Sequence, residues 1–257
     1  MSQAHEDKRI ALVTGAARGI GRAIAERLAR DGISLVLGDV ERDLLDQTVG
    51  EFNAAGREAH GLVLDVSSED SVAAAMAEIA RRFGRLDIVV NNAGIMPRVE
   101  GRNPRVEETP LAIWQATLAV NLTGTFLVCR AAIPLLRKSR SGRIVNISSR
   151  AARMSTSGNS HYSASKAGII GFSRVLAKEL GPEKITVNCI APSAVENAMH
   201  QGLASAQAHI DKLTQDTPLR RLATGEDIAN GVAFLASDQA NFITGTILDV
   251  NGGSYMA

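Results

Sequence analysis

The sequence predicts an α/β protein with a doubly wound, mostly parallel sheet of seven strands and helices on both faces, a Rossmann-like arrangement. Two observations predict it. Short apolar runs typical of buried strands alternate along the chain with longer segments of helical apolar spacing. A glycine-rich turn follows the first strand and opens the first helix, where such folds hold phosphates. A ligand crevice is therefore expected at the carboxyl ends of the strands.

The composition favours one cytoplasmic domain. The 257 residues contain no linker or low-complexity run, so residues 1–257 are expected to form a single unit. The net charge of +1, without a basic stripe, gives no reason to propose nucleic acid as a partner. Apolar runs fall short of the ~20 residues that span a bilayer, and the polar start is not a signal peptide, so no membrane association is expected.

Cysteine and histidine placement gives no sign of a metal site. The two cysteines, Cys129 and Cys189, lie in apolar surroundings and are expected to be small buried hydrophobes. The five histidines form no pair at ligand spacing, and we expect no metal.

The first unit is a strand, a glycine turn and a helix. Residues 10–14 form the strand, and helical spacing runs from Ile20 to Arg30. Between them, Gly15, Arg18, Gly19 and Gly21 form a turn whose backbone can approach a pyrophosphate without Cβ obstruction, at the positive end of a helix. Such a glycine pattern alone is weak, but its position between strand and helix makes it moderately specific.

The second strand, residues 34–39, ends in an acid eighteen positions after Gly21. Asp39 is placed to accept hydrogen bonds from the adenosine ribose, although a solvated loop or helix-cap role is the alternative. A carboxylate there would repel a 2′-phosphate, which favours NAD over NADP. Arg18 points the other way, because a cation beside the turn could pair with that phosphate.

The remaining elements continue the alternation. Strands are expected at residues 58–64, 86–90, 142–147, 184–190 and 245–250. Helices are expected from the end of the third strand to residue 83 and at residues 111–137, 160–180 and 225–236. A polar loop with three prolines, residues 95–110, is interpreted as a surface excursion near the mouth of the site.

Tyr162 and Lys166 are the strongest catalytic candidates. They lie four residues apart in a helical segment, so a phenol projects beside an ammonium. Tyrosine titrates near pH ~10, and proton exchange near neutrality requires about three units of depression, roughly 4 kcal/mol. A neighbouring cation acts in that direction. A lone Tyr-x-x-x-Lys is common, but here a strand ending in Ser148-Ser149 and a small-residue loop precede it.

In combination, these motifs resemble those of the short-chain dehydrogenase/reductase family in its compact single-domain form, over about residues 8–253. The residues that carry the resemblance are Thr14-Gly15-x-x-x-Gly19-x-Gly21, Asn91-Asn92-Ala93-Gly94, Ser149 and Tyr162-x-x-x-Lys166.

The resemblance implies a catalytic set of four residues. Tyr162 would exchange the proton of an alcohol or ketone oxygen, and Ser149 would hydrogen-bond that oxygen. Lys166 would lower the pKa of Tyr162 and bind the nicotinamide ribose. Asn121 would hold a water connecting Lys166 to solvent; without the resemblance it would be interpreted as an irregularity in the predicted helix.

The resemblance also implies further cofactor contacts. Asp65 and Val66 would contact adenine, although Asp65 alone suggests helix capping. The other expected contacts are Asn92, Ala93, Gly94, Pro192, Val195 and Asn197, with Ile20, Tyr162 and Lys166 completing the set. The chain departs from the family's usual pattern at Ser193, Asn197 and Asn251, where glycine, threonine and aspartate are more usual.

On the substrate side, residues 195–216 resemble the family's mobile lid, and residues 196–215 are expected to be helical. The pocket is expected to be lined by Ile95, Met96, Arg153, Met154, Asn159 and part of the lid. Arg153 could meet an anionic substrate, although a surface arginine is the favoured interpretation. Relatives also pack at the carboxyl-terminal end of the chain, which predicts a homotetramer.

Three functions are compatible with these residues. The first is an NAD(H)-dependent oxidoreductase that transfers a hydride to or from a polyol, sugar or small secondary alcohol or ketone. The second is an NADPH-dependent 3-oxoacyl-carrier reductase, suggested by Arg18 and the general resemblance. The third is a non-catalytic dinucleotide-binding regulatory or scaffold protein, which is disfavoured because all four catalytic positions hold competent residues.

Overall fold

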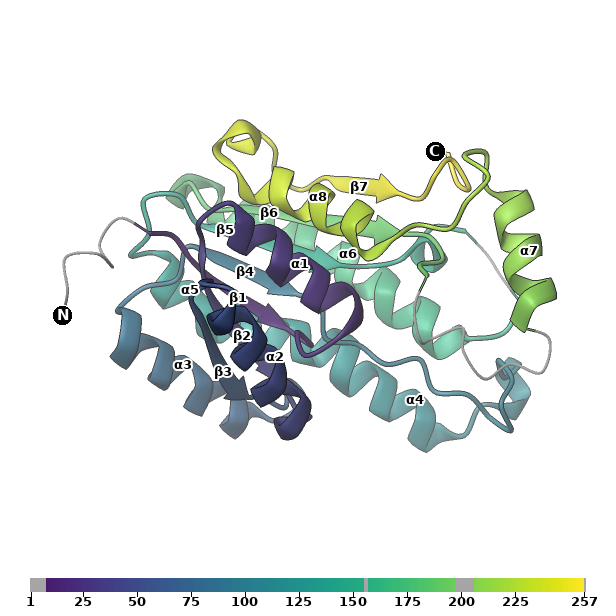
Figure 1. Cartoon of the computed structure of the whole chain (residues 1–257). Helices are drawn as coiled ribbons and strands as arrows, with labels where there is room; N and C mark the ends of the chain where they lie inside the picture. Colours follow the sequence, from purple (N-terminus) through teal and green to yellow (C-terminus); the bar gives the residue numbers. More distant parts are fainter. Residues whose placement is uncertain (1–7, 155–156, 197–205, 257) are drawn as a thin grey trace.

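A seven-stranded parallel sheet runs through the centre of the molecule in the order β3-β2-β1-β4-β5-β6-β7 (Figure 1). The computed structural model describes residues 8–154, 157–196 and 206–256. The strands are β1 Ile10–Thr14, β2 Ser34–Asp39, β3 Ala59–Val63, β4 Ile88–Asn91, β5 Arg143–Ile147, β6 Thr186–Pro192 and β7 Ile247–Val250. The central strands are fully buried, which explains their continuous apolar runs.

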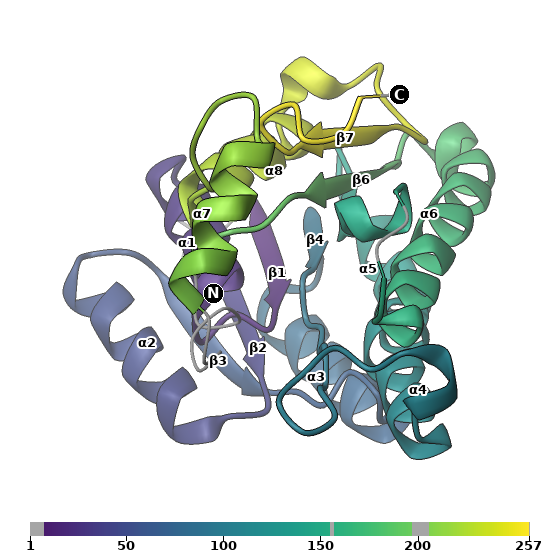
Figure 2. The same cartoon turned by 90° about the vertical axis from the view of Figure 1, so that its right-hand side faces the viewer.

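Helices cover both faces of this sheet (Figure 2). Helices α1, α2 and α8 pack on one face, and α3, α5 and α6 on the other, each with its own hydrophobic core. Their bounds, with those of α4 and α7, are α1 Gly19–Arg30, α2 Arg42–Ala54, α3 Glu69–Phe83, α4 Leu111–Leu118, α5 Gly124–Leu136, α6 Ser160–Leu180, α7 Ala206–Asp216 and α8 Gly225–Ala236. The predicted doubly wound α/β fold is therefore confirmed.

The strand order reverses at β1, which pairs with β2 on one side and with β4 on the other. Chain segments leaving β1 and β4 therefore diverge over opposite faces and leave a crevice at their carboxyl ends. The glycine turn after β1 and the Asn-Asn-Ala-Gly segment after β4 both begin at this edge.

The helix predicted over residues 111–137 is interrupted. One turn of π-helix, η3 Ala119–Thr123, separates α4 from α5. Asn121 lies in this turn with a side chain that is fully buried. Its side-chain amide forms hydrogen bonds with the backbone N–H and carbonyl of Ile95. The irregularity suspected from the sequence is therefore present. π-turns of this kind occur frequently at functional sites.

By length and composition alone, residues Leu111–Leu136 could cross a membrane. In the structure the segment contains the π-turn and packs through α5 on the sheet, where Val128, Cys129, Ala132 and Leu136 are fully buried. It is therefore a core helix of the domain. Cys129 and Cys189 are both buried free thiols, as predicted, and burial raises their pKa to about 12 and about 11.

Candidate functional site

The glycine turn after β1 depends on the absence of side chains at two positions. A Cβ on Gly21 would lie 2.0 Å from the carbonyl oxygen of Gly15, an impossible contact. Gly15 and Gly19 adopt φ angles of 63° and 58°, in the left-handed region that favours glycine. Sequence reasoning correctly assigned a tight turn here, and the close contact explains why Gly21 is required.

Thr14 and Asn92 hold this turn against the end of β4. The Thr14 hydroxyl oxygen accepts from the backbone N–H groups of Asn92 and Ala93 at 3.1 and 3.0 Å. The Asn92 amide donates to the carbonyls of Thr14 and Gly15, both at 3.0 Å. The predicted cofactor-lining segment and the predicted phosphate turn are therefore one connected unit.

The first turn of α1 presents its N–H groups to the crevice edge. The residue before the helix, Arg18, provides no side-chain cap, and Ile20 at its start is partly buried against the core. An uncapped helix amino terminus next to a left-handed glycine fits the pyrophosphate of a dinucleotide, because the N–H groups and the helix dipole both favour an anion.

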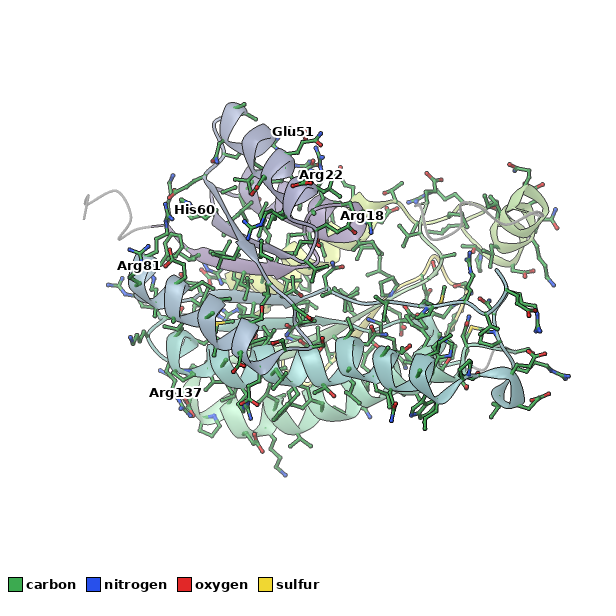
Figure 3. All side chains as sticks on the ribbon, turned by 90° about the horizontal axis from the view of Figure 1, so that it is seen from below. Arg18, Arg22, Glu51, His60, Arg81 and Arg137 are labelled. Atoms are coloured by element: carbon green, nitrogen blue, oxygen red, sulfur yellow. The ribbon has the colours of Figure 1, made fainter. Side chains whose placement is uncertain are left out.

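Asp39 ends β2 beside this turn. One carboxylate oxygen accepts from the N–H of Ala17 at 3.0 Å, and the other accepts from the N–H of Glu41 at 3.2 Å. Arg18, the candidate partner for a 2′-phosphate, is instead paired with the carboxylate of Glu41. Arg22, one helical turn further, pairs with Glu51 of α2 at 2.7 Å (Figure 3). Arg18 and Arg22 are thus both paired with acids.

Tyr162 and Ser149 meet on the other side of the crevice, at the start of α6 and just after β5. Burial raises the pKa of the Tyr162 hydroxyl, and its hydrogen bond with Ser149 opposes that rise. Ser149 also accepts from the N–H of Ala151 at 3.1 Å. Ser148 is buried and donates to the carbonyl of Lys166 at 2.9 Å, so its hydroxyl serves the packing of α6.

Lys166 lies beneath Tyr162. Its ammonium is 5.7 Å from the centre of the phenol ring and donates to the carbonyl of Ile147 at 2.8 Å. Burial lowers the pKa of Lys166 to about 8. The expected depression of the Tyr162 pKa by Lys166 is therefore not present in the protein alone, where desolvation of both groups dominates. A docked anionic dinucleotide would favour the charged lysine and restore that effect.

Asn121 is close to this pair. A Cβ on Gly94 would be 3.3 Å from both the Asn121 carbonyl oxygen of the side chain and the Lys166 nitrogen, which brings the three residues together. The Asn121 side chain is satisfied by the backbone of Ile95 and by the Ser165 hydroxyl at 3.0 Å. The backbone carbonyl of Asn121 accepts from the Thr125 hydroxyl at 2.8 Å.

The remaining predicted cofactor contacts differ in their surroundings. Asp65 is exposed and accepts from the N–H and hydroxyl of Ser67, while Ser68 caps α3. Val66 is buried in the core, against the position of Gly124.

On the nicotinamide side, Pro192 ends β6, and Val195 forms a β-bridge with Ala223. Asn197 and residues 198–205 of the expected lid lie outside the described residues; the helix predicted over 196–215 appears in the described part as α7.

The substrate side contains one clear correction. Arg153 is not a free surface arginine: it pairs with Asp249 of β7 at 2.6 Å, and its guanidinium lies 5.0 Å from the centre of the Tyr255 ring. An acid on β7 was not considered as a partner because nothing in the sequence indicates that the two positions meet. Arg153 therefore ties the loop after Ser149 to the carboxyl-terminal segment rather than awaiting a substrate.

The loop 95–110 also docks near Tyr162. The carbonyl of Pro97 contacts His161 at 3.2 Å, and the carbonyl of Pro104 accepts from the N–H of Asn159 at 3.1 Å. Asn159 precedes α6 with a left-handed φ of 61°. The predicted pocket residues Ile95 and Met96, in this loop, and Met154, in the loop after β5, are half-buried. The loop is thus fixed to the segment that presents Tyr162.

A buried polar network that the sequence analysis missed links β4, β5 and α6 behind the site. The Asn91 amide donates to Asn146 at 2.8 Å, and the Asn146 amide donates to Ser173 at 2.8 Å. Asn146 interrupts the apolar run of its strand, a signal that could have identified it. The network fixes the strands on which Ser149 depends against the helix of Tyr162 and Lys166.

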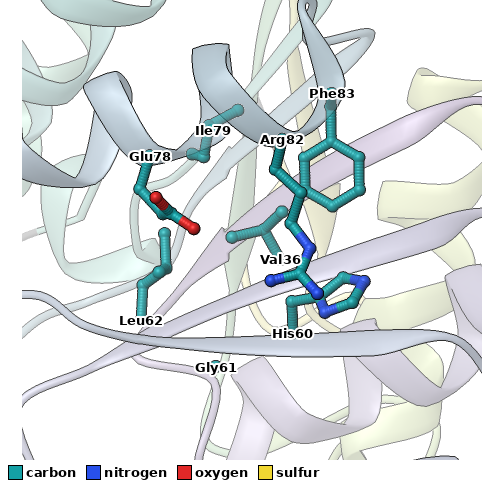
Figure 4. Close-up of a pocket in the computed structure, with 8 residues that line it drawn as sticks. All are labelled: Val36, His60, Gly61, Leu62, Glu78, Ile79, Arg82 and Phe83. Carbon is teal, nitrogen blue, oxygen red and sulfur yellow. The ribbon is translucent and has the colours of Figure 1, made fainter. Parts of the chain in front are cut away.

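Among the described residues, no group of three or more His, Cys, Asp or Glu side chains is placed to hold a metal. A cavity of about 90 Å³ lies between β2, β3 and α3, lined by residues that include His60, Arg82 and Phe83 (Figure 4). It lies at the β3–β2 edge of the sheet, away from β5 and α6, and is too small for a dinucleotide.

The fold and these two facing loops are those of a dinucleotide-dependent oxidoreductase. A family model described as enoyl-(acyl carrier protein) reductase matches residues 15–255. The 3-oxoacyl-[acyl-carrier-protein] reductase FabG of Aquifex aeolicus (strain VF5) is 40% identical over 248 residues, covering 96% of this chain and 97% of the relative. The chain belongs to the short-chain dehydrogenase/reductase family, and the enzyme class expected from its motifs is confirmed.

Two further relatives carry informative names. The (2S)-[(R)-hydroxy(phenyl)methyl]succinyl-CoA dehydrogenase subunit BbsD of Thauera aromatica is 39% identical over 245 residues, 95% of this chain and 96% of the relative. A crystal structure of a 3-oxoacyl-[acyl-carrier protein] reductase with bound NAD from Brucella melitensis superposes with a TM-score of 0.88 at 37% identity, covering 98% of this chain and 94% of that one.

Proposed function

We propose that this enzyme is a cytoplasmic, NAD(H)-dependent reductase of 3-oxoacyl thioesters that also catalyses the reverse oxidation of 3-hydroxyacyl thioesters. The second function considered from the sequence therefore supplies the substrate class, and the first supplies the cofactor. The names of two relatives support the substrate, because a 3-oxoacyl carrier thioester and a 3-hydroxyacyl-CoA share an oxygen on C3 next to a thioester. Polyols and sugars find no such support.

The observation that carries the proposal is the meeting of Ser149 with a partly buried Tyr162 above Lys166. When bound, the nicotinamide supplies or accepts the hydride. Reduction of the C3 ketone also requires one proton on its oxygen, and we assign that proton to the Tyr162 hydroxyl. Ser149 would orient the same oxygen, and its hydrogen bond would strengthen as negative charge develops there.

Lys166 and Asn121 would act on Tyr162. A protonated Lys166 would stabilise the phenolate left after proton transfer and would bind the nicotinamide ribose through ammonium N–H groups not used by Ile147. Asn121 would keep the π-turn and the Ile95 backbone in place, and a relay water would share its backbone carbonyl with the Thr125 hydroxyl.

The cofactor preference rests on the ends of β1 and β2. Asp39 lies beside the turn with both oxygens fixed by backbone N–H groups, and a 2′-phosphate would be repelled by its charge. Arg18, the cation that could bind a 2′-phosphate, is already paired with the carboxylate of Glu41. The relative with bound NAD is consistent with this preference. NADPH remains the competing cofactor, and would require Arg18 to leave Glu41.

We also propose a homotetramer. Apolar side chains on the outer surface of α5 and α6 are exposed, with Phe126 at 41% and Val175 at 59%. Phe126 packs edge-on against Phe172 of α6 at 6.1 Å between ring centres. An exposed Phe126 that packs on the partly buried Phe172 of a neighbouring helix supports a subunit contact here. The state is tested by light scattering of the purified protein.

The test of the proposed function is a comparison of initial rates. Acetoacetyl-CoA reduction, followed by nicotinamide absorbance, is expected with NADH and to be at least about tenfold slower with NADPH, as a repelled phosphate would cause. The Asp39→Asn variant should narrow the ratio of the NADH rate to the NADPH rate by raising the rate with NADPH. No turnover of 3-oxoacyl thioesters with either cofactor would contradict the substrate, and a strong NADPH preference would contradict the role of Asp39.

A further inference from the structure

Arg150 follows Ser149 directly and begins a short 3₁₀ turn, η4 Arg150–Ala152, at the carboxyl end of β5. Its side chain is half-buried. Burial lowers the pKa of its guanidinium, and the charge of Asp216, at the end of α7, opposes that shift. A cation is therefore held partly out of water next to the serine that contacts Tyr162.

Arg150 differs from the other arginines in one respect. Among partly buried arginines in the part of the chain that the structure describes, its side chain alone has no recorded hydrogen bond, ion pair within 4 Å or aromatic contact. Arg143 donates to the carbonyl of Gly142, and Arg57 lies over the ring of Phe52. Arg153, three residues along the same loop, is paired with Asp249. Shielding a guanidinium that has the charge of Asp216 nearby but no hydrogen bond is costly, and an anionic ligand that bonds it directly would offset that cost.

We propose that Arg150 binds a carboxylate carried by the acyl part of the substrate, close to the carbon that is reduced. This inference rests on the proposed function, because it extends the substrate from 3-oxoacyl thioesters to those with an anionic acyl chain. A guanidinium and a carboxylate form two parallel hydrogen bonds, so the contact would fix orientation as well as add affinity.

The reach of the side chain identifies which anionic group is meant. An arginine extends its guanidinium about 7 Å from Cα by ordinary bond lengths, and Arg150 adjoins Ser149. A pantetheine arm separates its phosphate from the thioester by about a dozen bonds, roughly 15 Å when extended. A carrier phosphate would therefore lie beyond Arg150, whereas a carboxylate on the acyl chain would lie within its range.

Asp216 provides the counter-charge when substrate is absent. It interacts with Arg150 through space without a recorded hydrogen bond, so the guanidinium is not consumed by it. A substrate carboxylate that approaches Arg150 more closely would replace Asp216 as its main partner. Removing the Asp216 charge should therefore strengthen binding of the anionic substrate, while removing Arg150 should weaken it.

The test uses two substrates of equal acyl length, 3-oxohexanoyl-CoA and 3-oxoadipyl-CoA, which differ by a terminal carboxylate. The wild-type enzyme should have a lower KM for 3-oxoadipyl-CoA. Arg150→Met should raise that KM about tenfold or more, the loss expected for one charge-assisted contact, and leave the KM for 3-oxohexanoyl-CoA within about twofold. Arg150→Lys should restore part of the loss, and Asp216→Asn should lower the KM for 3-oxoadipyl-CoA.

The matched control is Arg140→Met, which removes an exposed arginine that has no ion pair among the described residues. It should leave the KM for both substrates unchanged. If Arg150→Met affects kcat and KM of both substrates equally, the residue acts through the conformation of the loop or of α7, and the inference is wrong. Equal KM values for both substrates in the wild-type enzyme would also overturn it. If neither thioester is turned over, the proposed function itself fails, and this inference with it.

Discussion

The two loops that face each other across the crevice are built differently. The turn after β1 is shaped by the absence of side chains, because a Cβ on Gly21 would collide with its own loop. The loop after β5 is shaped by charged side chains: Arg153 is bound to Asp249, and Arg150 has no hydrogen bond or ion pair within 4 Å among the described residues. In the proposed function, the first loop would bind a cofactor common to many enzymes, whereas the second would bind the substrate. The difference explains why the cofactor class can be recognised from motifs while the substrate cannot.

The largest effect expected on the cofactor side follows from Gly21. Gly21→Val would place side-chain atoms where the Gly15 carbonyl lies, 2.0 Å from the Cβ position, and force the turn to open. Affinity for NADH, measured by fluorescence titration, should fall by more than about a hundredfold. Gly50→Ala, in helix α2 where a Cβ meets nothing within 4 Å, is the control and should bind NADH normally. Retained affinity in Gly21→Val would refute the steric account of this turn.

The Lys166→Met variant tests whether Lys166 of α6, which is expected to contact both the cofactor and Tyr162, is required for turnover. Lys166→Met removes the cation under Tyr162 and the hydrogen bond to the Ile147 carbonyl. We expect kcat/KM for acetoacetyl-CoA to fall by roughly 10²–10⁴. The far-ultraviolet circular dichroism should be unchanged, which would separate loss of chemistry from loss of fold. A variant with more than a tenth of wild-type activity would exclude Lys166 from the mechanism.

The pH dependence of cofactor use should report the same lysine. Burial lowers the pKa of Lys166 to about 8, so in the free enzyme the ammonium is present below that pH and is lost above it. The kcat/KM for NADH reports the free enzyme and should therefore decline as pH rises through about 8. Bound anionic cofactor favours the charged form, so the decline in kcat should occur at higher pH. A kcat/KM that rises through this range would contradict the assignment.

The smallest effect concerns the stability of the substrate loop. Arg153 and Asp249 are largely shielded, with side-chain exposures of 18% and 24%. Their coupling, measured by a double-mutant cycle of Arg153→Met and Asp249→Asn in urea denaturation, should be about 1 kcal/mol. Removing either partner should lower the free energy of unfolding. Zero coupling would mean that the loop is positioned by Tyr255 and the backbone instead.

The fold and most of the cofactor side could be predicted because local patterns determine them. Strand alternation and the Gly15 to Gly21 spacing are properties of short segments. The sequence marks Asn121 and Asn146 as irregular positions, but it does not give the π-turn or the Asn91–Asn146–Ser173 network, since these depend on contacts between distant elements. Arg153 was misinterpreted for the same reason: its partner Asp249 lies 96 positions away in the sequence. Arg150 was overlooked because only its lack of a recorded partner distinguishes it.

The most direct test of the central claim, that the Tyr162 hydroxyl supplies the proton to the substrate oxygen, is the Tyr162→Phe variant. Removing one hydroxyl leaves the ring that packs over Lys166 and should leave the affinity for NADH, measured by fluorescence titration, within about threefold of wild type. Turnover of acetoacetyl-CoA should fall by at least about a thousandfold. Normal NADH binding with no detectable turnover is the result predicted here, and substantial turnover in this variant would contradict it.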